Sequence, residues 1–75
     1  MTIEEAEREL APGLRIRVKR DKSKRIDKAT VIDQPYPHCA KAGYGFHWVR
    51  FDGTGTDEIR QYTIHAREIL GPDLD

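Results

Sequence analysis

Four short segments of the chain carry residue patterns of β-strands. Residues 14–20, LRIRVKR, alternate aliphatic and cationic side chains, which predicts a strand with one buried face. Residues 29–33, ATVID, hold three consecutive β-branched residues, and residues 46–51 and 58–64, FHWVRF and EIRQYTI, are the third and fourth strands that we expect. A short fifth strand is expected at residues 69–71.

The alternation within residues 46–51 also predicts which of its side chains are buried. Val49 and Phe51 share one side of this strand, whereas Trp48 shares the other side with the charged Arg50. We therefore expect Val49 and Phe51 to lie in the core and Trp48 to be at least partly exposed.

A short helix is expected before the first strand. Residues 2–10, TIEEAEREL, begin with Thr2 and carry Glu5 three positions later, which is the pattern of a capping box. Pro12 and Gly13 then end the helix.

Three connections have turn or loop patterns. The DGTG sequence at 52–55 predicts a tight hairpin. Residues 34–45 form a long loop with two prolines and two glycines, and the HARE sequence at 65–68 can form a single helical turn. Short strands at this spacing are typical of a small antiparallel barrel.

The segments GLRIRVKR, ATVID, WVRFDG and YTIHAREI occur in the order of four strands and a turn into a fifth strand. Over residues 13–70 this layout resembles the SH3-like barrels, including Tudor and KOW-type modules. The resemblance implies a mainly β fold, a small antiparallel barrel of about five short strands with a short N-terminal helix. Residues 1–12 would be the helix or arm, 13–71 the barrel and 72–75 a tail. Such barrels bind nucleic acids, peptides or methylated side chains, and many are docking subunits.

The length of 75 residues limits the chain to one domain with a small core. The single cysteine cannot form an internal disulfide, which favours a reducing compartment. The first residues are acidic and lack the pattern of a signal peptide, and no apolar run approaches the length of a membrane helix. We expect a soluble, cytoplasmic protein with no membrane contact.

The net charge of zero hides a strong segregation of charge along the chain. Residues 14–28 hold eight of the 13 Lys and Arg residues and only two aspartates, whereas residues 1–13 and 52–75 are acidic. Charge that is segregated in this way creates a local field.

The basic segment supplies the first group of candidate binding residues: Arg15, Arg17, Lys19, Lys22, Lys24 and Arg25. A row of cations suits a phosphate backbone, whose binding releases counterions. The same side chains can also meet an acidic protein partner, or form a solvated face that binds nothing. The zero net charge argues against nucleic acid, because dedicated nucleic-acid-binding domains are usually basic.

The loop PYPHCAKAGYGFHW, residues 35–48, supplies the second group: Tyr36, Tyr44 and Trp48. Such rings can stack on unpaired bases, frame a cage for a cation or anchor a protein interface. In the alternative interpretation, Phe46 or Trp48 fills the barrel and the prolines and glycines only shape the turn.

The histidines and the cysteine fit neither a metal centre nor a catalytic site. His38, Cys39, His47 and His65 lack the paired spacings of a structural zinc site. No acidic residue that would orient a Cys–His pair is indicated. We therefore expect no metal, no cofactor and no catalytic residues.

These observations favour a non-enzymatic binding module that docks on a larger complex or modulates it. It would contact a partner protein through the aromatic loop 35–48 and the basic arc 14–28. The alternative is a barrel that binds the backbone of RNA or DNA through the basic arc. Short edge strands allow a homodimer as well as a monomer.

Overall fold

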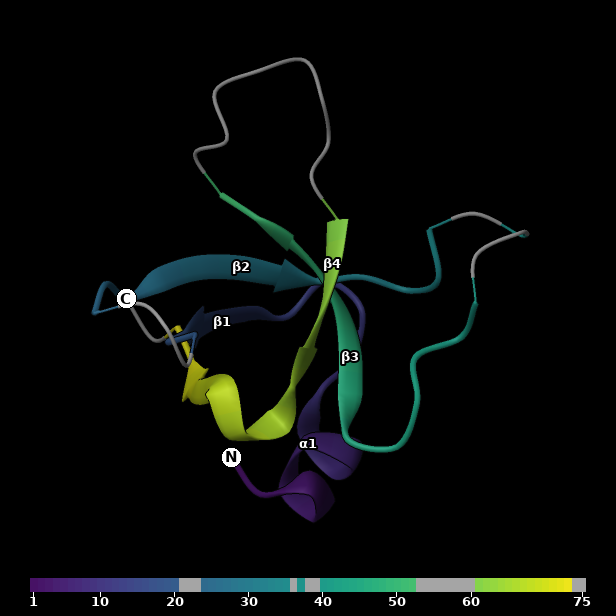
Figure 1. Ribbon diagram of the computed structural model, residues 1–75, viewed down its shortest axis with the longest axis horizontal. Coiled ribbons are helices and arrows are strands. Elements are labelled where there is room, and N and C mark those ends of the chain that lie inside the picture. Colours follow the sequence, from purple (N-terminus) through teal and green to yellow (C-terminus); the bar gives the residue numbers. More distant parts are fainter. Residues whose placement is uncertain (21–23, 36, 38–39, 53–60, 74–75) are drawn as a thin grey trace.

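The computed structural model describes residues 1–20, 24–35, 37, 40–52 and 61–73. The elements within them are, in chain order, α1 (Ile3–Glu9), β1 (Arg15–Val18), β2 (Asp27–Val31), β3 (Phe46–Phe51), β4 (Gln61–His65), the 3₁₀ helix η1 (Ala66–Glu68) and β5 (Ile69–Pro72) (Figure 1). Residues 53–60 lie outside the described residues, and with them most of the expected hairpin turn and the expected start of the fourth strand.

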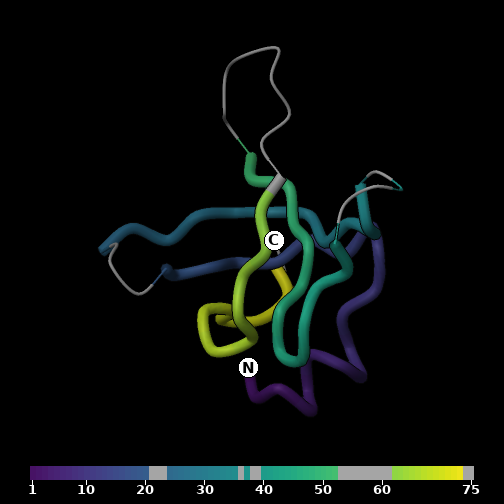
Figure 2. Tube along the Cα trace, turned by 45° about the vertical axis from the view of Figure 1, so that its right-hand side comes forward, coloured from purple at the N-terminus to yellow at the C-terminus, as the bar shows by residue number. Residues whose placement is uncertain are grey.

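The five strands that the structure describes form one antiparallel sheet with the order β4-β3-β2-β1-β5. In Figure 1 the strands β1 and β2 run across β3 and β4, and Figure 2 shows the same curl from another side. The sheet is therefore a curled half-barrel, which is compatible with a small β-barrel. The prediction of a mainly β, antiparallel fold with one short helix is confirmed.

The second strand begins earlier than the sequence predicts. β2 covers Asp27–Val31 instead of residues 29–33, because its first two residues pair with Val18 and Arg17 of β1. Apolar alternation does not reveal this extension, since both of these residues of β2 are charged.

The core lies on the inner side of the curl and receives side chains from all five strands. Its buried members are Ile16, Val18, Ala29, Val31, Val49, Phe51, Ile64 and Ile69. In the pairing of β2 with β3, Val31 lies opposite Val49. Val49 and Phe51 are buried and Trp48 is only partly buried, so the prediction for the two sides of this strand is confirmed.

α1 begins with the predicted capping box. Thr2 Oγ1 accepts a hydrogen bond from the backbone N–H of Glu5, and Glu5 Oε1 accepts one from the backbone N–H of Thr2, both at 3.1 Å. The hydrogen bonds with Thr2 also lower the pKa of the Glu5 carboxyl. Ala6 is fully buried, Leu10 packs against the core, and α1 contacts η1. The helix therefore covers one end of the core.

Gly45, in the turn before β3, is placed where α1 meets the end of β4. Its φ of +85° lies in a region that L side chains rarely adopt. A Cβ atom at this position would lie 2.9 Å from His65 Nε2 and 3.3 Å from Ile3 Cδ1. A side chain at this position would therefore be unfavourable for two independent reasons, the backbone conformation and the contacts with the ends of the His65 and Ile3 side chains.

These two effects can be separated by comparing two glycines. Gly13 also has a positive φ, of +96°, but nothing lies within 4 Å of a Cβ added there. Gly13→Ala should therefore lower the free energy of unfolding by about 1–2 kcal/mol, through the unfavourable backbone conformation alone. Gly45→Ala should lower it by about 1–3 kcal/mol more, because the side chains of Ile3 and His65 must move. Urea denaturation measures both costs, and equal losses would contradict the packing of α1 against this turn.

Candidate functional site

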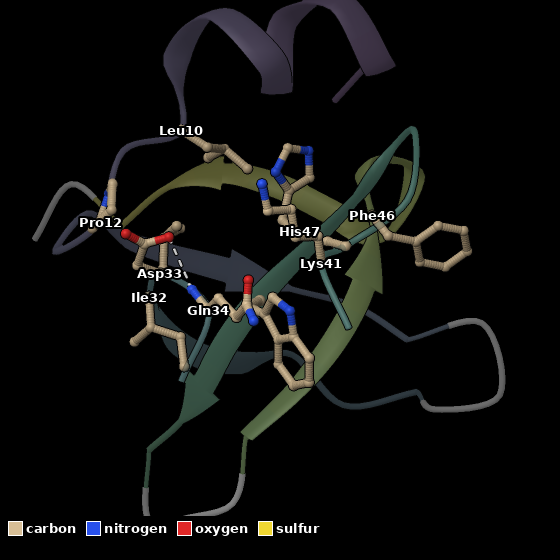
Figure 3. A pocket seen from close by; sticks show the side chains of 11 residues that line it. Leu10, Pro12, Ile32, Asp33, Gln34, Lys41, Phe46 and His47 are labelled. Atoms are coloured by element: carbon tan, nitrogen blue, oxygen red, sulfur yellow. Dashed lines mark hydrogen bonds between the residues drawn. The ribbon is translucent and has the colours of Figure 1, made fainter. Parts of the chain in front are cut away.

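An open hollow of about 380 Å³ lies where β2 ends and β3 begins (Figure 3). We call it the Trp48 groove. Its apolar lining residues are Leu10, Pro12, Val31, Ile32, Ala42, Phe46 and Trp48, and its polar lining residues are Asp33, Gln34, Lys41 and His47. Figure 3 shows that the segment after α1, the segment after β2 and the loop before β3 all contribute side chains. An apolar surface with a few polar groups is typical of a binding site.

Sheet pairing brings Trp48 and Ile32 together in this groove. The backbone N–H of Ile32 donates to the carbonyl oxygen of Trp48 at 3.0 Å, which continues the pairing of β2 with β3 beyond the end of β2. Both side chains are partly buried. The two residues therefore form a semi-exposed apolar wall on the outer side of the sheet.

A hydrogen bond holds the indole of Trp48 in place. Its Nε1–H donates to the carbonyl oxygen of Ala40 at 3.3 Å. On the same loop, Gln34 Nε2 donates to the carbonyl oxygen of Pro37 at 3.3 Å, and the N–H of Phe46 donates to the carbonyl oxygen of Gly43 at 2.9 Å. The first of these bonds joins the loop to β3, and the other two are local bonds that shape the loop and the turn into the strand.

The structure brings only some of the expected aromatic residues together. Trp48 lines the groove, but Tyr44 is 75% exposed and does not line it. Phe46 lines the groove with part of its surface, is 42% exposed, and lies edge-on to His65 with ring centroids 4.9 Å apart. Tyr36 lies outside the described residues.

Arg15 of the basic arc is engaged in an ion pair within the chain. Its two terminal nitrogens contact the two carboxylate oxygens of Asp52, with Nη1 donating to Oδ1 at 2.6 Å, and Nη1 also donates to Thr30 Oγ1 at 2.9 Å. The hydrogen bond from Arg15, together with the charges of Arg15, Lys28 and Arg50, lowers the pKa of Asp52.

Arg25 is also paired, and it shares its partner with Arg20, a residue absent from our sequence-based candidates. The Nε atoms of Arg25 and Arg20 lie 3.4 and 3.8 Å from carboxylate oxygens of Asp27. The guanidinium carbon of Arg20 also lies 4.1 Å from the centroid of the Phe51 ring. Arg20 therefore covers an edge of the core, a role that its position in a run of charged residues does not reveal.

The remaining cations of the basic arc are differently placed. Arg17, Lys19 and Lys24 are exposed, and no ion pair of theirs occurs within the described residues. Lys22 lies outside that part of the chain. The arc is thus not a continuous row of free cations.

Several residues of the site were missing from the sequence-based candidates. Leu10, Pro12 and Lys41 line the groove, and Leu10 and Pro12 are distant from Trp48 in the sequence. Ile32 belonged to the strand expected at residues 29–33; it lies one residue beyond the end of β2 and lines the groove. One signal was available for Lys41, because it lies within the loop 35–48.

His47 and His65 lie near the junction with α1. His47 points toward the inner side of the sheet, and its buried Nε2 has no hydrogen-bond partner in the described structure. Burial lowers the pKa of His47, His65 adds to this effect, and the charge of Glu7 opposes it. His65 Nδ1 accepts a hydrogen bond from the N–H of Arg67 at 3.1 Å and so caps η1.

Among the described residues, no three His, Cys, Asp or Glu side chains are grouped to hold a metal ion. His38 and Cys39 lie outside them. The groove offers apolar surface and isolated polar groups, which suit binding.

Comparisons with known proteins add no match to this description: no family model, no curated protein and no solved structure matches the chain. In the described part of the chain, none of the helices has the length and apolar character needed to cross a membrane.

The partly buried imidazole of His47 makes stability depend on pH. Its pKa is lower in the folded chain than the unperturbed value of about 6.5, so the unfolded chain binds the proton more readily. The folded state should lose stability as the pH falls below about 6.5. Between about pH 7.5 and about pH 5, the free energy of unfolding should therefore fall less in His47→Gln than in the wild type. Urea denaturation at both pH values tests this, and an unchanged pH dependence would refute the role of His47.

Proposed function

We propose that this chain is a non-enzymatic protein-interaction module, which binds a segment of a partner protein in the Trp48 groove. The proposal depends mainly on one observation: Trp48 is partly exposed, and its indole is held by Ala40. Tryptophan is among the residues that contribute most to protein interfaces. A side chain that is already fixed loses little conformational entropy when a partner binds.

The surroundings of Trp48 support a peptide segment as the ligand. Ile32, Leu10 and Pro12 provide apolar surface, and Gln34 and Lys41 provide hydrogen-bond donors at its margin. The hollow of about 380 Å³ is open and lies at the surface. It is suited to one or two side chains of an extended segment, whose backbone can use the polar groups.

Binding of a nucleic acid has weaker support. Two of the six candidate cations, Arg15 and Arg25, contact carboxylates of the chain itself. Neutralised cations release fewer counterions from a phosphate backbone. Trp48 can stack on an unpaired base, so this alternative is kept as an outcome of the experiments below.

We also propose that the half-barrel belongs to the SH3-like barrels. The return of β5 to the side of β1 and the single turn of η1 before β5 support this proposal. A module of this kind docks on a larger complex or modulates it, either as a monomer or as a homodimer. The single cysteine is consistent with the cytoplasm as its location.

The proposed groove can be tested with a displayed library of random peptides. Peptides selected on the wild type should shift the amide resonances of Ile32, Phe46 and Trp48 in NMR titrations. Trp48→Ala should weaken their binding at least about tenfold, which corresponds to about 1.4 kcal/mol. Ile32→Ser should act in the same direction.

Tyr44→Ala is the matched control, because Tyr44 is an exposed aromatic residue of the same loop that does not line the groove. It should leave peptide binding unchanged. Thermal unfolding must show that each variant is folded. Peptides that bind Trp48→Ala and Ile32→Ser as tightly as the wild type, or a library that gives no peptide, would overturn the proposal.

A further inference from the structure

Among the described residues, the outer side of the sheet beside the Trp48 groove carries four cations and two carboxylates, and the groove lining adds one of each, Lys41 and Asp33. The cations are Arg15 and Arg17 of β1, Lys28 of β2 and Arg50 of β3, and the carboxylates are Asp52 and Asp73. All four cations are exposed, and each alternates with a buried residue of its strand. This side of the sheet therefore has an excess of positive charge.

Both of these carboxylates, Asp52 and Asp73, already form ion pairs within the chain. Asp52 pairs with Arg15. The carboxylate of Asp73, whose side chain is only 5% exposed, lies 3.4 Å from Lys28 Nζ. Within the described residues, Arg17 and Arg50 have no ion-pair partner. Both side chains are exposed, so a ligand can reach them.

The position of Arg17 opposite Lys28 is unfavourable for the sheet itself. The two residues are directly paired between β1 and β2, and like charges at directly opposed positions destabilise a sheet. Asp73 compensates Lys28, but no described carboxylate compensates Arg17. A carboxylate from a partner would relieve this repulsion.

Strand geometry places these cations within reach of a segment anchored in the groove. Arg50 is two residues from Trp48 on the same side of β3, a separation of about 7 Å. Arg15 of β1 lies level with Arg50, two strands away, and Arg17 is two residues further along β1, so Arg17 lies about 12 Å from Arg50. An extended chain advances about 3.3 Å per residue. It would pass Arg50 about two residues after its anchor and Arg17 about three to four residues later.

We infer that the partner segment is an acidic peptide, with an apolar side chain in the Trp48 groove and Asp or Glu residues over Arg50 and Arg17. This inference rests on the function proposed above and adds the chemistry of the partner. The apolar anchor supplies most of the affinity, because it is the part that leaves water. The exposed ion pairs supply selectivity and a faster, salt-dependent association.

Selection from the same displayed library tests the acidic chemistry separately from the groove. Peptides selected on the wild type should be enriched in Asp and Glu at about two to six positions from an apolar residue. The enrichment should disappear when the library is selected on the Arg17→Glu/Arg50→Glu variant. The control variant Arg8→Glu/Arg67→Glu makes the same change in net charge on α1 and η1, and it should keep the enrichment.

One selected peptide should then be compared with its Asp→Asn and Glu→Gln counterpart by fluorescence anisotropy. We expect the acidic form to bind the wild type about tenfold more tightly at low salt, and this advantage should shrink as salt is added. The advantage should be lost in Arg17→Glu/Arg50→Glu, whereas the amide peptide should bind that variant as well as it binds the wild type.

The two proposals fail in different ways. If acidic and amide peptides bind equally and both need Trp48, the acidic partner is refuted and the groove stands. If Trp48→Ala changes the binding of neither peptide, the groove itself is refuted. If a single-stranded oligonucleotide binds more tightly than the acidic peptide and also needs Arg17 and Arg50, the ligand is a nucleic acid and the inference is overturned.

Discussion

Residues along β3 point alternately toward the core and toward the outer side of the sheet, and this alternation couples the core to the proposed binding surface. Val49 and Phe51 can be buried only if Trp48 and Arg50 lie on the opposite side. The pairing of Val31 with Val49 sets the register. A shift by one residue would bury Arg50 and expose Val49, which a core of this size could not tolerate.

The helix and the loop before β3 also contribute to the core and to the groove. α1 closes the end of the core and brings Leu10 to the groove, while Gly45 allows the chain to turn beneath Ile3. The carbonyl oxygen of Ala40 then fixes the indole of Trp48. The groove is therefore made by the same contacts that close the core, and its shape should persist without a ligand.

Local patterns in the sequence predict the elements of this fold well. The capping box of α1 and the two sides of β3 follow from residues close together in the chain, and both predictions are confirmed. Contacts across the sheet could not be predicted in this way. The ion pair of Arg15 with Asp52 depends on which strands are neighbours and in which register, as does the meeting of Ile32 with Trp48. The sequence predicted that β2 starts at residue 29, whereas it starts at Asp27, and this prediction was wrong for the same reason.

Trp48 is the only tryptophan in the sequence and is partly exposed. Lys41 and Asp33 line the groove with it, and Arg50 follows two residues later on the same side of β3, so cations outnumber carboxylates around the indole. Quenching of its fluorescence by iodide and by caesium, each compared with free N-acetyltryptophanamide at constant ionic strength, tests both the exposure and the sign of the surrounding charge. We expect partial quenching that favours iodide over caesium, because Arg50 and Lys41 together outweigh Asp33. Quenching by neither ion would mean that Trp48 is buried, and quenching that favours caesium would mean that its surroundings are acidic. Either result would contradict the proposed surface.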